Sequence, residues 1–227
     1  MSKALNVAVC QVNPTLGNFQ KNIDIISKNY KYAVEKGADL VVFPEMSITG
    51  YPPQDLLNNK EFISQNISYL NELTKSTTIP CIFGYVDFED NKKFNAAAVC
   101  QDGEIVYKYH KIHLPNYDVF DERRYFHSGD SIGIFDLKVN NSDYKIALQI
   151  CEDLWEDEYE RKISEEIIEN DPDLIINISA SPFAKDRKNE RMKLIQSKYK
   201  DANCPFIYCN LVGGQDELIF DGFSMLS

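Results

Sequence analysis

The sequence predicts an α/β protein in which helices cover both faces of mixed β-sheet structure. Short apolar runs rich in β-branched residues recur along the 227 residues, and segments with helical periodicity lie between several of them. Two of the runs, LVVF and LIINI, are apolar at consecutive positions, as in strands buried on both faces. The pair Asp102-Gly103 favours a type I′ turn, so an antiparallel hairpin is expected among the other strands.

Each expected element follows from a local pattern. Apolar runs predict strands over 5–12, 39–43, 79–86, 96–101, 104–107, 145–151, 173–179 and 205–212. Apolar residues at helical spacing predict helices over 18–37, about 60–76, about 157–170 and about 186–202. Asn18 is the expected N-cap of the first helix and Gly37 its expected stop. The fourth helix is expected to bury Met192, Leu194, Ile195 and Tyr199.

No composition shift, internal repeat or low-complexity linker divides the sequence. Residues 1–227 are therefore expected to form one domain. The last residues, LIFDGFSMLS, have the pattern of a strand and a turn with no element after them. We therefore expect the fold to be truncated at this end, with more chain following Ser227.

Charge and composition argue against several classes of protein. The chain carries 24 Lys and Arg against 35 Asp and Glu, a formal charge of −11, whereas binding to nucleic acid or to an anionic membrane needs clustered cations. No apolar run approaches the roughly 18–20 residues that span a bilayer, and the N-terminal apolar stretch is too short for a cleaved signal. We expect a cytoplasmic protein that binds neither nucleic acid nor membranes.

The six cysteines are scattered singly along the chain. There is no C-x-x-C pair and no Cys/His cluster with the spacing of zinc ligands, so neither a metal site nor a disulfide framework is expected. Most of the cysteines should be small buried apolar residues. The three histidines have no spacing that suggests a Cys-His protease.

Three polar residues lie where the predicted strands end or a loop begins. Glu45 follows a buried strand, Cys151 ends the strand KIALQIC, and Lys111 opens a long polar and aromatic segment. Sites of α/β proteins lie at the carboxyl ends of strands, where a desolvated carboxylate can transfer protons and a strand-to-helix turn can present a nucleophile. A nearby cation would favour the thiolate and stabilise an oxyanion. Taken singly, each residue is more often structural, as a capping carboxylate, a buried thiol or a solvated lysine.

Taken together and in order, the motifs FPE, K-x-x-LPNY-x-VFDE-x-RYF and ICEDLW resemble those of the nitrilase, or carbon–nitrogen hydrolase, superfamily. Within it, the blocks HLPNY…FDERRYF, NISASPF and VGGQDELIFDG are most similar to the amino-terminal glutaminase domains of glutamine-dependent NAD⁺ synthetases. The resemblance extends over nearly the whole chain. It implies a four-layer αββα sandwich.

The resemblance also implies residue roles. The catalytic set of the superfamily falls on Glu45, Lys111 and Cys151, with the backbone N–H of Glu152 as a further oxyanion donor. It implies that L-glutamine is hydrolysed to glutamate and ammonia through a cysteine thioester, without a cofactor. Glu122 matches a second acid close to the lysine, and the positions that match a glutamine pocket are Tyr117, Phe120, Ser181 and Arg187.

The chain departs from the family pattern at Asp118, where the family commonly has Gly, so the local turn and the pocket shape stay open. It also lacks a Ser-Gly-Gly-x-Asp-Ser loop for ATP. ATP and Mg²⁺ are therefore expected only in a separate C-terminal synthetase domain, which would use the ammonia to convert deamido-NAD⁺ into NAD⁺. The resemblance further implies a homo-oligomer.

Two alternatives to the glutaminase stay open. One is a stand-alone amidase of the same superfamily that acts on another ω-amide, a carbamoyl compound or a nitrile with the same three catalytic residues. The other is a scaffold that keeps the fold without the catalysis.

Overall fold

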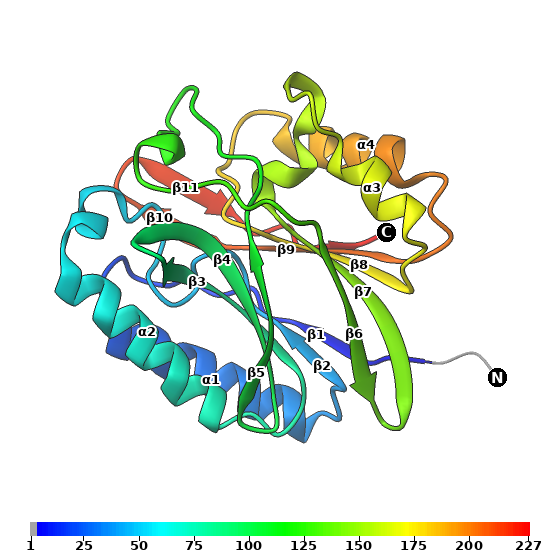
Figure 1. Cartoon of the computed structure of the whole chain (residues 1–227), viewed down its shortest axis with the longest axis horizontal. Helices are drawn as coiled ribbons and strands as arrows, with labels where there is room; N and C mark the ends of the chain where they lie inside the picture. Colours follow the sequence, from blue (N-terminus) through cyan, green and yellow to red (C-terminus); the bar gives the residue numbers. More distant parts are fainter. Residues whose placement is uncertain (1–3) are drawn as a thin grey trace.

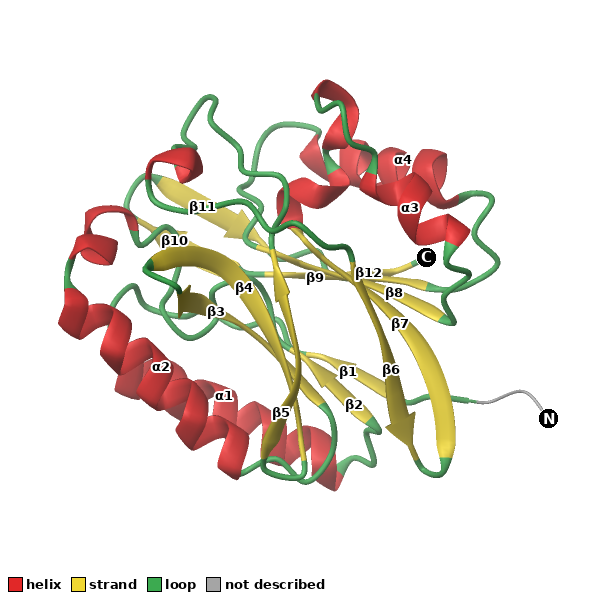
Figure 2. Ribbon diagram, viewed as in Figure 1, coloured by secondary structure: helices red, strands yellow, loops and turns green. Residues whose placement is uncertain are grey.

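The computed structural model describes residues 4–227 and arranges them in four layers, in the order helix, sheet, sheet, helix (Figures 1 and 2). Helices α1 (Phe19–Glu35) and α2 (Lys60–Lys75) cover the outer face of one sheet. Helices α3 (Ile163–Glu169) and α4 (Arg187–Tyr199) cover the outer face of the other. The αββα sandwich is therefore confirmed.

The first sheet contains, in spatial order, β1 (Val7–Val9), β2 (Leu40–Val42), β3 (Cys81–Glu89), β4 (Lys92–Gln101) and β5 (Glu104–His110). Strands β1 to β3 are parallel, and β4 runs antiparallel to both of its neighbours. Asp102 and Gly103 link β4 to β5 with φ values of 51° and 83°. A type I′ turn requires positive φ at both positions, so the predicted hairpin is confirmed.

The second sheet has the spatial order β12 (Met225–Leu226), β9 (Phe206–Asn210), β8 (Leu174–Ser179), β7 (Ser142–Ile150) and β6 (Gly133–Val139). Its central strands β7, β8 and β9 are parallel, and the two edge strands are antiparallel to their neighbours. Strands β10 (Val212–Gln215) and β11 (Leu218–Asp221) form a separate hairpin. Both large sheets are mixed, as predicted.

Two apolar cores hold the layers together. In β2, Val41 packs in the core under α1 and α2, whereas Leu40 and Val42 pack in the core that includes the second sheet. All three side chains are fully buried. The consecutive apolar residues of this strand therefore serve two different cores.

Several element boundaries confirm the sequence patterns and others correct them. The side chain of Asn18 accepts from the N–H of Lys21, and Gly37 has a φ of 78°, as expected for the start and stop of α1. The third helix is shorter than predicted and begins at Ile163, because Glu156–Glu158 form a separate 3₁₀ turn. The ammonium of Lys162 donates to the carbonyls of that turn and its flank.

The predicted buried face of the fourth helix is wrong in part. Met192 is 38% exposed, and the buried stripe of α4 runs through Arg191, Ile195 and Tyr199. These positions are spaced by four residues and share one face. Strand β6 was not predicted, although its buried residues alternate with more exposed ones as period two requires. None of the helices in residues 4–227 has the combination of length and apolar character that a bilayer span requires.

Candidate active site

Cys151 lies at a sharp turn between β7 and a 3₁₀ segment, Cys151–Leu154. Its φ is 42°, a left-handed conformation that is costly for a residue with a Cβ and is characteristic of constrained functional positions. The side chain is 7% exposed and lines a cavity of about 280 Å³. The predicted strand-end elbow is present, with its thiol at the cavity wall.

Asp153 fixes this elbow, and the sequence analysis missed it. Its fully buried carboxylate accepts from the N–H of Ile150 at 2.9 Å, and from the N–H groups of Ile112 and His113 at 3.1 and 2.9 Å. The hydroxyl of Tyr109 donates to the same carboxylate at 2.8 Å. One side chain thus ties the end of the cysteine strand to the segment that follows Lys111. The only sequence feature that could have indicated Asp153 is the acidic pair that follows Cys151 in the motif ICED.

Lys111 joins two carboxylates in a buried ionic cluster. Its Nζ lies 2.9 Å from Oε1 of Glu45 and 2.9 and 3.0 Å from the two oxygens of Glu122. The three side chains are between 0% and 5% exposed, so solvent does not screen these contacts. The structure therefore brings together the two acids and the lysine, which lie up to 77 positions apart in the chain, since 122 − 45 = 77.

Neutral donors complete the coordination of the two acids. Glu45 accepts from the N–H of Ala180 and from Nδ2 of Asn95, both at 2.6 Å. Glu122 accepts from the hydroxyl of Tyr51 at 2.8 Å and, more weakly, from Asn95 at 3.4 Å. Asn95 thus bridges both carboxylates, and no sequence pattern pointed to it.

The charges of this cluster act on the Cys151 thiol. Burial raises the pKa of Cys151 well above its ordinary value, the carboxylate of Glu45 raises it further, and the Lys111 ammonium opposes both. Burial alone would lower the pKa of Lys111, but the charges of Glu122 and Glu45 raise it well above its ordinary value. At neutral pH the site therefore holds a charged lysine beside a protonated thiol, and the thiol needs a base before it can attack.

The cavity beyond the thiol is lined by four of the predicted substrate residues, Tyr117, Phe120, Ser181 and Arg187. Glu45, Lys111 and Glu122 do not line it. The Lys111 ammonium contacts both acids, and the charges of all three act on the Cys151 thiol. Two grooves of about 770 and 860 Å³ contain none of the predicted site residues, whereas a cavity of about 300 Å³ shares Tyr117 and Glu152 with this one.

The cavity wall combines aromatic, acidic and cationic groups. Tyr117 packs edge-on against Phe120, and its hydroxyl donates to the carboxylate of Glu152 at 2.9 and 3.1 Å. Burial raises the pKa of Glu152 to about 7. The guanidinium of Arg187 lies 5.0 Å from the Trp155 ring centre and pairs loosely with Glu190 at 3.3 Å. Its side chain is 33% exposed, so this cation is accessible to a ligand.

Asp118 occupies a left-handed turn at the cavity mouth, with a φ of 50°. Glycine adopts this conformation without strain, and Asp is among the few other residues that tolerate it. The departure from glycine therefore preserves the turn.

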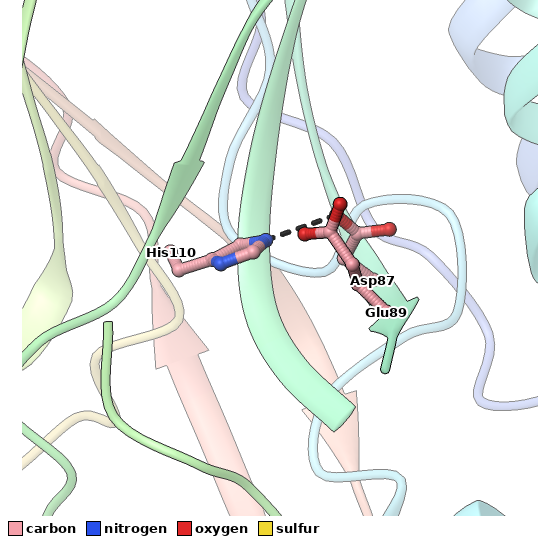
Figure 3. Close-up of side chains that lie close together, drawn as sticks. All are labelled: Asp87, Glu89 and His110. Atoms are coloured by element: carbon pink, nitrogen blue, oxygen red, sulfur yellow. Dashed lines mark hydrogen bonds and ion pairs between the residues drawn. The ribbon is translucent and has the colours of Figure 1, made fainter. Parts of the chain in front are cut away.

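A second cluster of titratable groups lies outside the cavity. Asp87, Glu89 and His110 could each offer a ligand atom within 4.8 Å of the others (Figure 3). Nε2 of His110 and Nζ of Lys108 already contact the Asp87 carboxylate at 2.9 and 3.0 Å. Although burial acts in the opposite direction, these hydrogen bonds lower the pKa of Asp87 to about 2. The protein's own groups satisfy Asp87, and we assign no ion to this cluster.

Comparison with known proteins identifies the family of the chain. The family model described as carbon–nitrogen hydrolase matches residues 6–227. The chain belongs to the carbon–nitrogen hydrolase family. It is 41% identical to the glutamine-dependent NAD⁺ synthetase of Thermotoga maritima over 99% of its own length and 38% of that protein. It is 33% identical to the synthetase of Acinetobacter baylyi, again over 99% of its length and 40% of the relative.

Solved structures of other proteins share the fold. The glutamine-dependent NAD⁺ synthetase from Acinetobacter baumannii, in complex with ADP, superposes with a TM-score of 0.90 at 31% identity, covering 99% of this chain and 41% of that one. A variant of the amidase from Nesterenkonia sp. AN1 gives a TM-score of 0.83 at 20% identity, covering 98% and 85% of the two chains. The second likeness shows the fold alone. The chain spans about two-fifths of the length of the synthetases it matches.

Proposed function

We propose that this carbon–nitrogen hydrolase is a glutamine amidohydrolase with Cys151 as its nucleophile, Glu45 as its general acid–base and Lys111 as its cation. The observation that carries the proposal is the buried contact of the Lys111 ammonium with Glu45 and Glu122, whose charges act on the thiol of a cysteine that lines a small cavity. The relatives named glutamine-dependent NAD⁺ synthetases support glutamine as the substrate.

In the first half-reaction, Glu45 takes the thiol proton as the sulfur attacks the side-chain carboxamide carbon. Because burial keeps the thiol protonated at rest, this transfer coincides with attack. The developing oxyanion is stabilised by the Lys111 ammonium and by the backbone N–H of Glu152. The tetrahedral intermediate collapses when Glu45 protonates the leaving nitrogen, which departs as ammonia and leaves a γ-glutamyl thioester.

In the second half-reaction, water replaces ammonia. Glu45 accepts a proton from the water as its oxygen attacks the thioester carbon, and the thiolate is expelled and reprotonated. Glu122 takes no proton in this scheme. Its role is to hold Lys111 in place, since it contacts the ammonium with both oxygens.

The cavity favours an amino acid amide over a simple amide. A free α-carboxylate needs a cation or a hydroxyl donor, and Arg187 and Ser181 lie on the same wall. A cavity of about 280 Å³ lies just below the usual volume range of small-molecule sites, which suits a substrate as small as glutamine.

In the relatives, the matched region is part of a longer chain. We propose that the ammonia serves a C-terminal synthetase domain that forms NAD⁺ from deamido-NAD⁺ with ATP and Mg²⁺. The glutaminase step itself needs no cofactor. The proposal includes a single catalytic domain over 1–227, a homo-oligomeric assembly and a cytoplasmic location.

The test combines turnover with covalent labelling. The chain should release glutamate and ammonia from glutamine, and a glutamine-like electrophile should modify Cys151. Cys151→Ala should lose both activities, whereas Cys204→Ala removes a partly buried cysteine that does not line the cavity and should retain both. Labelling at a different cysteine would reject the assignment. Failure with glutamine, together with turnover of an amide that has no α-amino acid group, would favour the stand-alone amidase.

A further inference from the structure

Arg191 is the largest of the fully buried side chains of residues 4–227. It lies on the inner face of α4, and its Nη1 contacts the Asp221 carboxylate at 2.8 and 3.1 Å. Asp221 ends β11, in the VGGQDELIFDG block, and is 22% exposed. A buried guanidinium needs a counter-charge and acceptors for its remaining N–H groups, and Asp221 supplies the first of these.

The remaining N–H groups of Arg191 point at the start of the loop before α4. Nη2 donates to the carbonyls of Ser181 and Pro182 at 2.9 and 3.1 Å. Nε and Nη2 also donate to the hydroxyl oxygen of Ser181, at 3.3 and 3.1 Å. Because a guanidinium has donors and no acceptor, Ser181 can only accept from it.

The side-chain amide of Asn210 forms hydrogen bonds with the backbone of Ser181. Its Oδ1 accepts from the Ser181 N–H at 2.9 Å, and its Nδ2 donates to the Ser181 carbonyl at 3.2 Å. A serine hydroxyl has one hydrogen and two lone pairs, and here two donors, Nε and Nη2 of Arg191, lie within hydrogen-bond distance of its oxygen. The hydroxyl hydrogen is the one polar group of Ser181 that these contacts leave free. Ser181 is 5% exposed and lines the cavity beside Cys151.

We propose that Arg191 is a positioning residue that makes the Ser181 hydroxyl an obligatory hydrogen-bond donor, and that this donor selects the α-carboxylate of the substrate rather than its α-ammonium. The inference rests on the proposed glutaminase function and deepens it. An O–H that must donate stabilises a carboxylate, whereas an ammonium needs an acceptor. Arg191 itself stays out of the cavity and acts only through Ser181.

A competing acceptor for the hydroxyl hydrogen is the hydroxyl of Tyr208. It is fully buried, and hydrogen-bonding interactions with the hydroxyls of Ser179 and Ser181 oppose the rise that burial causes in its pKa. If the Ser181 hydrogen pointed to Tyr208, the serine would contribute nothing to carboxylate recognition. Tyr208→Phe removes this acceptor with little change of shape, and so it serves as the matched control.

The test compares three amides as substrates of the 227-residue chain. These are glutamine, glutaramate, which lacks the α-ammonium, and 4-aminobutanamide, which lacks the α-carboxylate. Ser181→Ala should lower kcat/KM for the two carboxylate-bearing amides about 10- to 100-fold, the range for one hydrogen bond to a charged group, mainly through KM. The value for 4-aminobutanamide should change less than about threefold, and Tyr208→Phe should resemble the wild type with all three.

Variants of Arg191 extend the test. Arg191→Lys keeps a positive charge beside Asp221 but lacks the planar guanidinium that donates twice to the Ser181 hydroxyl. It should therefore lower kcat/KM less than Ser181→Ala does, and again mainly for the two carboxylate-bearing amides. A merely structural arginine would instead lower turnover of all three amides alike. Should the Arg191 variant not fold, the Ser181 and Tyr208 variants still decide the question.

The outcomes separate the two proposals. A wild-type chain that hydrolyses none of the carboxylate-bearing amides overturns the glutaminase proposal and this inference with it. A wild type that hydrolyses glutamine, together with an Ser181→Ala loss that is equal for all three amides or larger for 4-aminobutanamide, overturns the inference alone. A Tyr208→Phe loss equal to that of Ser181→Ala also overturns it.

Discussion

Replacing Lys111 with methionine separates the structural and catalytic roles of the buried ionic cluster. The substitution keeps much of the side-chain volume and removes the ammonium. In the wild type this ammonium contacts Glu45 and Glu122 at 2.9 Å, and no side chain of the three is more than 5% exposed. The variant therefore leaves two buried carboxylates that share only neutral donors.

The expected cost follows from that geometry. Removing one partner of a buried ion pair destabilises a protein by about 3–5 kcal/mol, because the remaining charge stays desolvated. Burial already raises the pKa of Glu122, and the Lys111 charge opposes the rise. Without the lysine the pKa of Glu122 should rise further. A carboxyl with a raised pKa in the folded state contributes stability that is present below its unfolded value of 4.5 and is lost as the pH rises. The variant should therefore be least stable at neutral pH and recover on acidification.

The assay is urea denaturation of the wild type, Lys111→Met and Lys111→Met/Glu122→Gln at about pH 5 and about pH 7.5, with ammonia release from glutamine measured in parallel. The double variant replaces one of the two carboxylates with a neutral amide, so it should regain more than half of the lost stability. Neither variant should hydrolyse glutamine, because both lack the cation at the oxyanion.

Two results would refute this reasoning. A Lys111→Met protein within about 0.5 kcal/mol of the wild type at pH 7.5 would mean that the cluster carries no net charge that needs the lysine. Glutamine turnover by the double variant would show that the ammonium is not required for catalysis. If the single variant does not fold at neutral pH, the double variant and the measurement at pH 5 still test both points.

Three further predictions concern single side chains. The pKa of Glu152 is about 7 against an ordinary 4.5, so the stability of the wild type should fall as the pH rises through this range. In urea denaturation, Glu152→Gln should be more stable than the wild type by up to about 3 kcal/mol at pH 8.5 and equally stable near pH 4. The pKa of Asp87 is about 2 against an ordinary 3.8, so Asp87→Asn should lower the free energy of unfolding by about 2 kcal/mol at pH 7. This difference from the wild type should vanish as the pH falls from about 4 to 2. Asp118 has a φ of 50°, so Asp118→Ala should cost about 1 kcal/mol in thermal denaturation, and Asp118→Gly should not.

The residues that the sequence predicted share a local signature. Cys151 and Glu45 each follow an apolar strand, and a polar residue at that point stands out against its neighbours. The fold class could be predicted for the same reason, since apolar periodicity records which faces are buried. The motif order then related these positions to the family.

The missed residues have no such signature, because their partners are remote. Asp153 bonds to backbone groups 40 and 41 positions away, and Asn95 bonds to Glu45 across 50 positions. The local sequence around Asp153 and Asn95 has no pattern that predicts these partners. Arg191 was missed for a related reason: a charged residue in a helix is assigned to the surface by default. The sequence pattern placed its neighbour Met192 in the core, but in the structure Arg191 is buried and Met192 is exposed.

The protonation states of the side chains in the site are even harder to predict from the sequence than their contacts. Glu45, Glu122 and Glu152 are all buried, their charges raise the pKa of the Cys151 thiol, and the charge of Lys111 opposes them. A buried site cannot hold three carboxylates and a thiolate against one ammonium, so protons must reside on some of these groups. Burial and the charges of Glu45, Glu152 and Glu122 raise the pKa of the Cys151 thiol, and the Lys111 charge opposes this rise. The ionisation of the Cys151 thiol therefore depends on charged side chains that the fold brings together from distant segments, and a local sequence pattern does not record these neighbours.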